Sequence, residues 1–196
     1  MSDPWKVDIE IDDRPEGRVA YVAIDYRAKL NCLGAGLMRE FIDRMTDLAA
    51  DDSLRVAVLT GGGDKSFVAG ANMMELLELD SASAREFLTL VHSVCRVCRE
   101  LPVPVIARIN GPCFGAGLEL AAACDMRLAT DRSLFGMPEV KLGVPSVVEA
   151  ALLPQLIGWG KTRWMVYTGE TVDAATALDW GLVEKVVPEG DLDAAV

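Results

Sequence analysis

The stretch that decides the fold is residues 102–129, which read PVPVIARINGPCFGAGLELAAACDMRLA. Its first part, 102–109, is an apolar run opened by prolines and is typical of a buried strand. A glycine-rich loop follows at 110–117, and the small residues of 115–123 favour a closely packed helix. A second apolar strand is expected at 125–129. A strand, a loop, a helix and another strand in this order indicate parallel strands joined by a helical crossover.

The rest of the chain continues this alternation. Strands are expected at 7–11, 19–24, 55–60 and 183–187, with a turn at 14–17 between the first two. Helices are expected at 37–48, where Leu37, Phe41, Met45 and Leu48 share one face, at about 83–100, and in two or three pieces over 146–180. We therefore expect an α/β fold with a parallel component, in a single domain over 1–196 with its core at about 7–187.

Composition excludes several function classes. The chain has 196 residues, is 51% hydrophobic and carries a net charge of −11 without a basic cluster, which argues against nucleic acid as the main partner. The N-terminus, MSDPWKVDIEIDD, is acidic, and the apolar stretches are short and interrupted by charge. We expect neither a signal peptide nor a membrane span, and a cytoplasmic location.

The five cysteines do not indicate disulfides or a metal site. Their number is odd, and Cys95 and Cys98 form a CxxC within a segment whose apolar spacing is helical, with no second pair to complete a zinc set. The single histidine, His92, lies on the same predicted helix. We interpret all three as structural residues and expect no metal.

Two glycine-rich segments resemble nucleotide-binding loops but fail on spacing. Residues 59–66, LTGGGDKS, follow a strand and end in Lys-Ser, but a phosphate loop needs glycine directly before the lysine, and Asp64 stands there. Residues 110–117 have the spacing Gly-x-x-x-Gly-x-Gly, which is not the Gly-x-Gly-x-x-Gly of dinucleotide-binding folds. The phosphate loop is rejected, and the dinucleotide-binding motif is disfavoured by its spacing.

Two acidic residues and two loops are the candidate chemistry. Glu119 and Glu139 lie in the frames GAGLE and FGMPE, where burial would raise a carboxyl pKa and suit acid–base work. The segments 67–72 and 114–117 enter helices, whose first N–H groups lack intrahelical partners. Facing one another, the two segments would form an oxyanion hole. The alternative for the two segments is that they are only tight turns between packed elements. The alternative for the two glutamates is that they are only solvated acids at helix ends.

The motifs AVLTG at 57–61, FVAGAN at 67–72, PVIA at 104–107, NGPCFGAGLELA at 110–121, CD at 124–125 and FGMPE at 135–139 occur in this order. Together they resemble the enoyl-CoA hydratase/isomerase (crotonase) superfamily, from about Val7 to the end of the chain. The resemblance implies a spiral of β-β-α repeats, acyl-CoA thioester substrates, and a homotrimer or hexamer. It implies no separate cofactor, since coenzyme A is part of the substrate.

The resemblance also assigns residue roles. It implies that the N–H groups of Ala71 and Ala116 hold the thioester oxygen, that Glu119 activates water and that Glu139 transfers a proton at Cα. Contacts with coenzyme A and substrate would come from Ala28, Lys29, Leu30, Ala69, Ala71, Met73 and Gly115, with Lys29 and Lys65 as counter-charges.

The sequence departs from the family pattern in three places. Residues 145–148 read PSVV where the hydratases have a glycine-rich segment, Ala116 stands where many members have glycine, and the usual C-terminal helices are expected to be absent or truncated. The leading interpretation is a 2-enoyl-CoA hydratase. The alternatives are an enoyl-CoA isomerase or another crotonase lyase and, from another class, a non-catalytic acyl-CoA-binding homologue.

Overall fold

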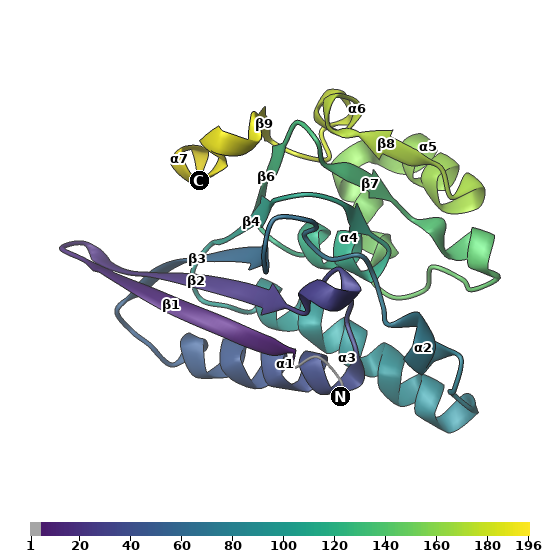
Figure 1. Cartoon of the computed structure of the whole chain (residues 1–196), viewed down its shortest axis with the longest axis horizontal. Coiled ribbons are helices and arrows are strands. Elements are labelled where there is room, and N and C mark those ends of the chain that lie inside the picture. The colour runs from purple at the N-terminus through teal and green to yellow at the C-terminus, as the bar shows by residue number, and fades with distance from the viewer. Residues whose placement is uncertain (1–4) are drawn as a thin grey trace.

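The computed structural model describes residues 5–196 and is built on a mixed sheet. Within these residues the main sheet has six strands in the order β1-β2-β3-β4-β6-β9 (Figure 1). β1 (Lys6–Arg14) and β2 (Gly17–Asp25) form an antiparallel hairpin. From β2 onward the neighbours are parallel: β3 (Leu54–Gly61), β4 (Val105–Ile109), β6 (Met126–Thr130) and β9 (Lys185–Val187). The expected α/β architecture is confirmed.

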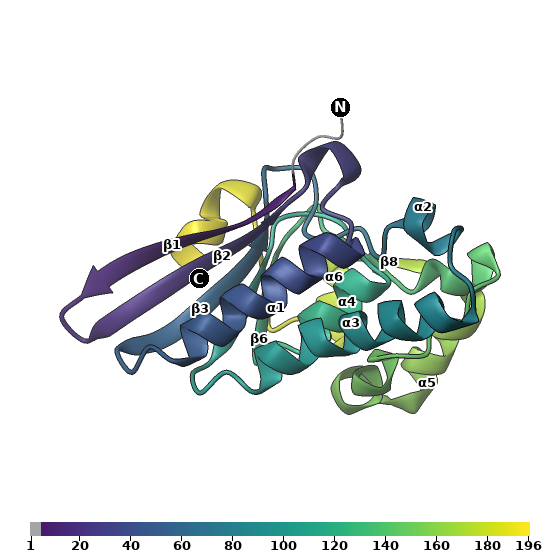
Figure 2. The same cartoon turned by 90° about the horizontal axis from the view of Figure 1, so that it is seen from below.

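Two long helices lie side by side beneath this sheet, as Figure 2 shows. They are α1 (Ala35–Ala49) and α3 (Ser81–Arg99). α1 buries the predicted face of Leu37, Phe41, Met45 and Leu48, because these residues recur at helical spacing. α3 starts at a capping box, in which the Asp80 side chain accepts from the Ser83 N–H and the Ser83 hydroxyl bonds to the Asp80 backbone N–H.

The strands β3, β4 and β6 are parallel, so the loops that leave them emerge at one edge of the sheet, the position at which open α/β sheets bind ligands. After β3 the chain reaches α2 (Met73–Leu76), and after β4 it forms β5 (Cys113–Phe114) and α4 (Ala116–Ala122). After β6 it forms β7 (Leu134–Gly136) and the 3₁₀ helix η2 (Pro138–Leu142). β5, β7 and β8 (Thr171–Asp173) make a second small sheet, and its β5–β7 pairing places α4 beside η2.

The C-terminal part packs against both sheets. It comprises η3 (Ala150–Leu152), α5 (Leu153–Thr168), α6 (Ala174–Trp180), η4 (Glu189–Asp191) and α7 (Leu192–Ala195). The N-terminal 3₁₀ helix η1 (Arg27–Lys29) follows β2. In Figure 1, α5 and α6 lie beside β8, whereas α7 lies near β6 and β9.

Two predicted boundaries are wrong. The strand expected at 102–109 begins at Val105, because Pro102 and Pro104 have no N–H to give to a neighbouring strand. The helical region expected from 146 begins at Ala150, and β8 interrupts it. The preceding segment, which contains Ser146 and Glu149, is irregular and forms part of the site described below.

The cysteines lie in the core. All five are free and buried, and burial raises the pKa of the Cys95 thiol. Within residues 5–196, no group of three or more His, Cys, Asp or Glu side chains is arranged to hold a metal ion. Among the same residues, none of the helices is long and apolar enough to cross a membrane.

Candidate active site

The two candidate carboxylates and the two candidate amide donors line one cavity of about 120 Å³. Ala71 comes from the segment after β3, Ala116 and Glu119 from α4, and Glu139 from η2. Ala69, Met73 and Gly115 also line it. The volume exceeds that of a single buried water several-fold, so the cavity can hold an organic group.

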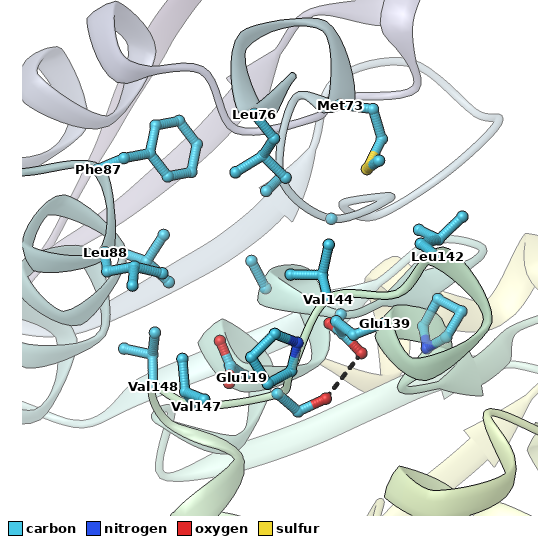
Figure 3. A pocket seen from close by; sticks show the side chains of 18 of the residues that line it. Met73, Leu76, Phe87, Leu88, Glu119, Glu139, Leu142, Val144, Val147 and Val148 are labelled. Carbon is cyan, nitrogen blue, oxygen red and sulfur yellow. Dashed lines mark hydrogen bonds between the residues drawn. The ribbon is translucent and has the colours of Figure 1, made fainter. Parts of the chain in front are cut away.

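Apart from Ser146, the remaining side chains of the cavity wall are apolar. Figure 3 shows labelled apolar side chains in the same cavity as the two glutamates, which are the polar labelled groups in the view. The apolar side chains of the wall include Leu76, Phe87, Leu88, Val91, Leu142, Val144, Val147 and Val148. An apolar cavity with a few convergent polar groups is the usual form of a small-molecule site.

The two amide-bearing segments lie directly against each other. Phe114 donates its N–H to the Val68 carbonyl at 3.1 Å. Gly117 permits this approach, because a Cβ at that position would lie 2.1 Å from the Val68 carbonyl oxygen. Within residues 5–196, neither the Ala71 N–H nor the Ala116 N–H donates to a backbone or side-chain acceptor. Two neighbouring N–H groups are therefore available to a ligand oxygen.

Glu119 is the more deeply buried acid, with 4% of its surface exposed. Its Oε1 accepts hydrogen bonds from the backbone N–H groups of Glu149 at 3.0 Å and Ala150 at 2.8 Å. Burial raises the pKa of Glu119 to about 7, with further increases from the charges of Glu139 and Glu149 and opposition from the two N–H groups. Its pKa thus lies near neutrality, where a general base is most effective.

Glu139 occupies the first turn of η2 and faces the same cavity. Its Oε2 accepts a hydrogen bond from the Ser146 hydroxyl at 3.0 Å, drawn as the dashed line in Figure 3. Burial raises the pKa of Glu139, and the Ser146 bond opposes that rise. Gly115, with φ +51°, leaves room for this carboxylate, since a Cβ there would lie 2.5 Å from Glu139 Oε1.

Three residues expected near coenzyme A lie outside this cavity. Ala28 and Lys29 are exposed in η1, and Leu30 lines a separate polar pocket with Lys65 and the glycines after β3. That pocket is linked to the cavity through the backbone, since Ala69 donates its N–H to the Leu30 carbonyl at 3.1 Å.

Three residues that contact the carboxylates, Ser146, Glu149 and Ala150, were not predicted from the sequence. Ser146 was noted only as a departure from a glycine pattern, although a hydroxyl replacing glycine beside an acid is a signal for a hydrogen bond. Glu149 and Ala150 contact Glu119 through their backbone N–H groups, which no side-chain pattern reveals.

The burial of Glu119 predicts how the stability of the folded protein depends on pH. Its pKa rises from 4.5 to about 7 on folding, so the folded protein binds more protons than the unfolded chain between these pH values, and stability falls as pH increases through them. The loss is on the order of 3 kcal/mol. Glu119→Gln keeps an oxygen for the two N–H groups and should be progressively more stable than wild type from pH 5 to pH 8 by urea denaturation. The variant Glu16→Gln, at an exposed position, is the control and should show no such trend. If the unfolding free energies of Glu119→Gln and wild type changed in parallel with pH, the prediction would be wrong.

An acid pair, adjacent amide donors and an apolar cavity are typical of an enzyme that performs acid–base chemistry on a small substrate. The chain belongs to the enoyl-CoA hydratase/isomerase family, whose sequence model matches residues 14–196. It is 38% identical over 178 residues to the short-chain-enoyl-CoA hydratase of Clostridium acetobutylicum, covering 90% of this chain and 68% of that protein. The crotonyl-CoA hydratase of Syntrophomonas wolfei gives the same identity and coverage.

Solved structures confirm the expected crotonase-type fold. The enoyl-CoA hydratase from Bacillus anthracis has a TM-score of 0.89 at 32% identity, covering 95% of this chain and 72% of that one. Pseudomonas aeruginosa DspI has a TM-score of 0.89 at 33% identity, covering 100% of this chain and 78% of the other.

Proposed function

We propose that this protein is a 2-enoyl-CoA hydratase, which adds water to the double bond conjugated to a thioester. The observation that carries the proposal is the pairing of two carboxyl groups of raised pKa with two neighbouring N–H groups that have no acceptor within residues 5–196. Water addition needs both: acid–base groups to move two protons, and donors for the oxygen that becomes negative.

The proposed step begins at Glu119. Its Oε1 is held by two amides, whereas Oε2 accepts no hydrogen bond within residues 5–196 and is free to accept a proton from water. The water oxygen bonds to Cβ, and the π electrons move onto the thioester oxygen, where the N–H groups of Ala71 and Ala116 stabilise the enolate by roughly 3 kcal/mol each. The step requires Glu139 to be protonated at the start, and Glu139 then gives that proton to Cα. Proton transfer from Glu119 to Glu139 restores the starting state.

The names of the relatives favour a short acyl chain, since two of them are a short-chain-enoyl-CoA hydratase and a crotonyl-CoA hydratase. An isomerase is the second candidate, because one similar protein, from Mycosarcoma maydis, is an enoyl-CoA isomerase/hydratase. Double-bond migration needs one carboxyl group to move a proton between two carbons, whereas this cavity contains two. A non-catalytic acyl-CoA-binding protein has no need to bury both.

Comparing rates on crotonyl-CoA, a longer 2-enoyl-CoA and a 3-enoyl-CoA tests the proposal. We expect hydration of crotonyl-CoA, detected as loss of the conjugated thioester absorbance, to be the fastest of the three reactions. Faster conversion of the 3-enoyl-CoA would replace the hydratase by an isomerase. Tight binding of acyl-CoA without turnover would support the non-catalytic homologue.

The proposal includes the coenzyme A contacts and the assembly. The nucleotide end would lie near Ala28, Lys29 and Leu30, where Lys29 and Lys65 offset the negative charge of the protein as a whole. A homotrimer or hexamer is expected, which analytical ultracentrifugation can measure.

A further inference from the structure

Glu149 connects the cavity to helix α3. It follows Val148, which lines the cavity, and it directly precedes η3. Its backbone N–H and that of Ala150 are the two donors to Glu119 Oε1. The position of Glu149 therefore determines how Glu119 is held.

The side chain of Glu149 points to α3 and is bound at both oxygens. Oε1 lies 2.5 Å from His92 Nδ1, and Oε2 accepts from Arg99 Nη1 at 2.6 Å. His92 and Arg99 are two helical turns apart, so they share a face of α3. The Glu149 side chain is 8% exposed, whereas those of Arg99 and His92 are 34% and 48% exposed.

The charge on Glu149 is stabilised by these partners. Burial alone would raise the pKa of Glu149, but the hydrogen bonds and charges of Arg99 and His92 outweigh it and hold that pKa below its usual value. Breaking such a pair leaves an uncompensated buried charge, so the bonded arrangement is strongly preferred. The segment before it, 145–148, is irregular, and no backbone N–H of these four residues donates to a backbone carbonyl within residues 5–196.

We propose that Glu149 is a positioning residue for the reaction, because its ion pair with Arg99 and His92 of α3 anchors the turn whose two N–H groups orient Glu119. The kinetic part of this inference rests on the proposed hydratase function. The structural part concerns Glu119 in the free protein and can be measured without any substrate.

The pKa of Glu119 could depend mainly on the charge of Glu149 or mainly on the alignment of the N–H groups of Glu149 and Ala150. Removing the Glu149 side-chain charge separates these two explanations, because they predict opposite shifts in the Glu119 pKa. The charged and titratable groups that face Glu119 are Glu139 on η2, Glu149, and Cys95 on α3, with Arg99 and His92 behind Glu149. Removing the Glu149 charge would lower the pKa of Glu119 if charge dominated. Loss of the aligned N–H groups would raise it, because those groups bind the ionised form.

The experiment follows the Glu119 carboxyl carbon by ¹³C NMR during a pH titration of the intact protein, with Glu119→Gln to assign the signal. Glu149→Leu removes the ion pair and Arg99→Gln breaks it from the α3 side. We expect both to raise the Glu119 titration midpoint by about 0.5 pH units or more and to lower kcat for hydration roughly tenfold, with KM little changed. Glu149→Gln still accepts from Arg99 and should retain kcat within about threefold.

Arg96→Gln is the matched control, since Arg96 lies on the same helix and pairs with Glu100 at 3.8 Å instead. It should leave the midpoint and kcat unchanged. A lower midpoint in Glu149→Leu, or a folded Arg99→Gln protein with wild-type midpoint and kcat, would overturn the proposal. Should Arg99→Gln fail to fold, His92→Gln at the half-exposed partner provides the same test with a smaller expected shift. If neither the wild-type protein nor any variant hydrates a substrate, the proposed function fails, but the Glu119 titration midpoints still decide whether Glu149 positions Glu119.

Discussion

Replacing Ala116 with proline should lower kcat for hydration by about 10²–10³-fold, because proline has no N–H to donate to the developing oxyanion. At this position the substitution should remove the N–H with little effect on the fold. Ala116 is the first helical residue of α4, after the N-cap Gly115, and the first turn is where a helix tolerates proline best. The N–H that is lost has no acceptor within residues 5–196, so no structural hydrogen bond disappears with it.

The control for this prediction is Ala116→Gly, which keeps the N–H and should retain activity within a few-fold. Steady-state rates on crotonyl-CoA measure both variants, and circular dichroism establishes that they fold. A folded proline variant with full activity would show that the Ala116 N–H does not hold the substrate oxygen.

Much of the fold could be predicted because its main elements have regular apolar patterns. The hairpin of β1 and β2, the buried face of α1 and the strand β3 all lie close to their expected positions. The short strands β5, β7 and β8 were not predicted, since two or three residues are too few to show an alternating pattern. They matter here because the β5–β7 pairing brings α4 next to η2.

The site could be predicted only as far as residue type carries its chemistry. Glu119 and Glu139 stood out by their apolar frames, and the structure places both in one cavity. The proximity of the segments at Val68 and Gly117 depends on tertiary packing, and the resemblance to a family, not the residue pattern, indicated it. Backbone donors such as the Glu149 N–H are identical in every residue except proline, so their use at Glu119 is invisible in sequence.

The two glutamates should respond differently to the same substitution. Glu119→Gln retains an oxygen for the N–H groups of Glu149 and Ala150 but can no longer take a proton from water, so hydration should fall by roughly 10²-fold or more. Exchange of the Cα proton depends on Glu139 and the two amide donors, and it should survive better in this variant.

Glu139→Gln should suppress hydration and exchange together, because the group that moves the Cα proton is lost while the Ser146 hydroxyl still has an oxygen to bind. Loss of crotonyl-CoA absorbance reports hydration, and deuterium incorporation at Cα of a saturated acyl-CoA reports exchange. Hydration at the wild-type rate in Glu119→Gln, combined with abolished double-bond migration in Glu139→Gln, would point to an isomerase with a single acid. In that case Glu119 would be a buried neighbour whose pKa near 7 reflects its surroundings and not a catalytic task.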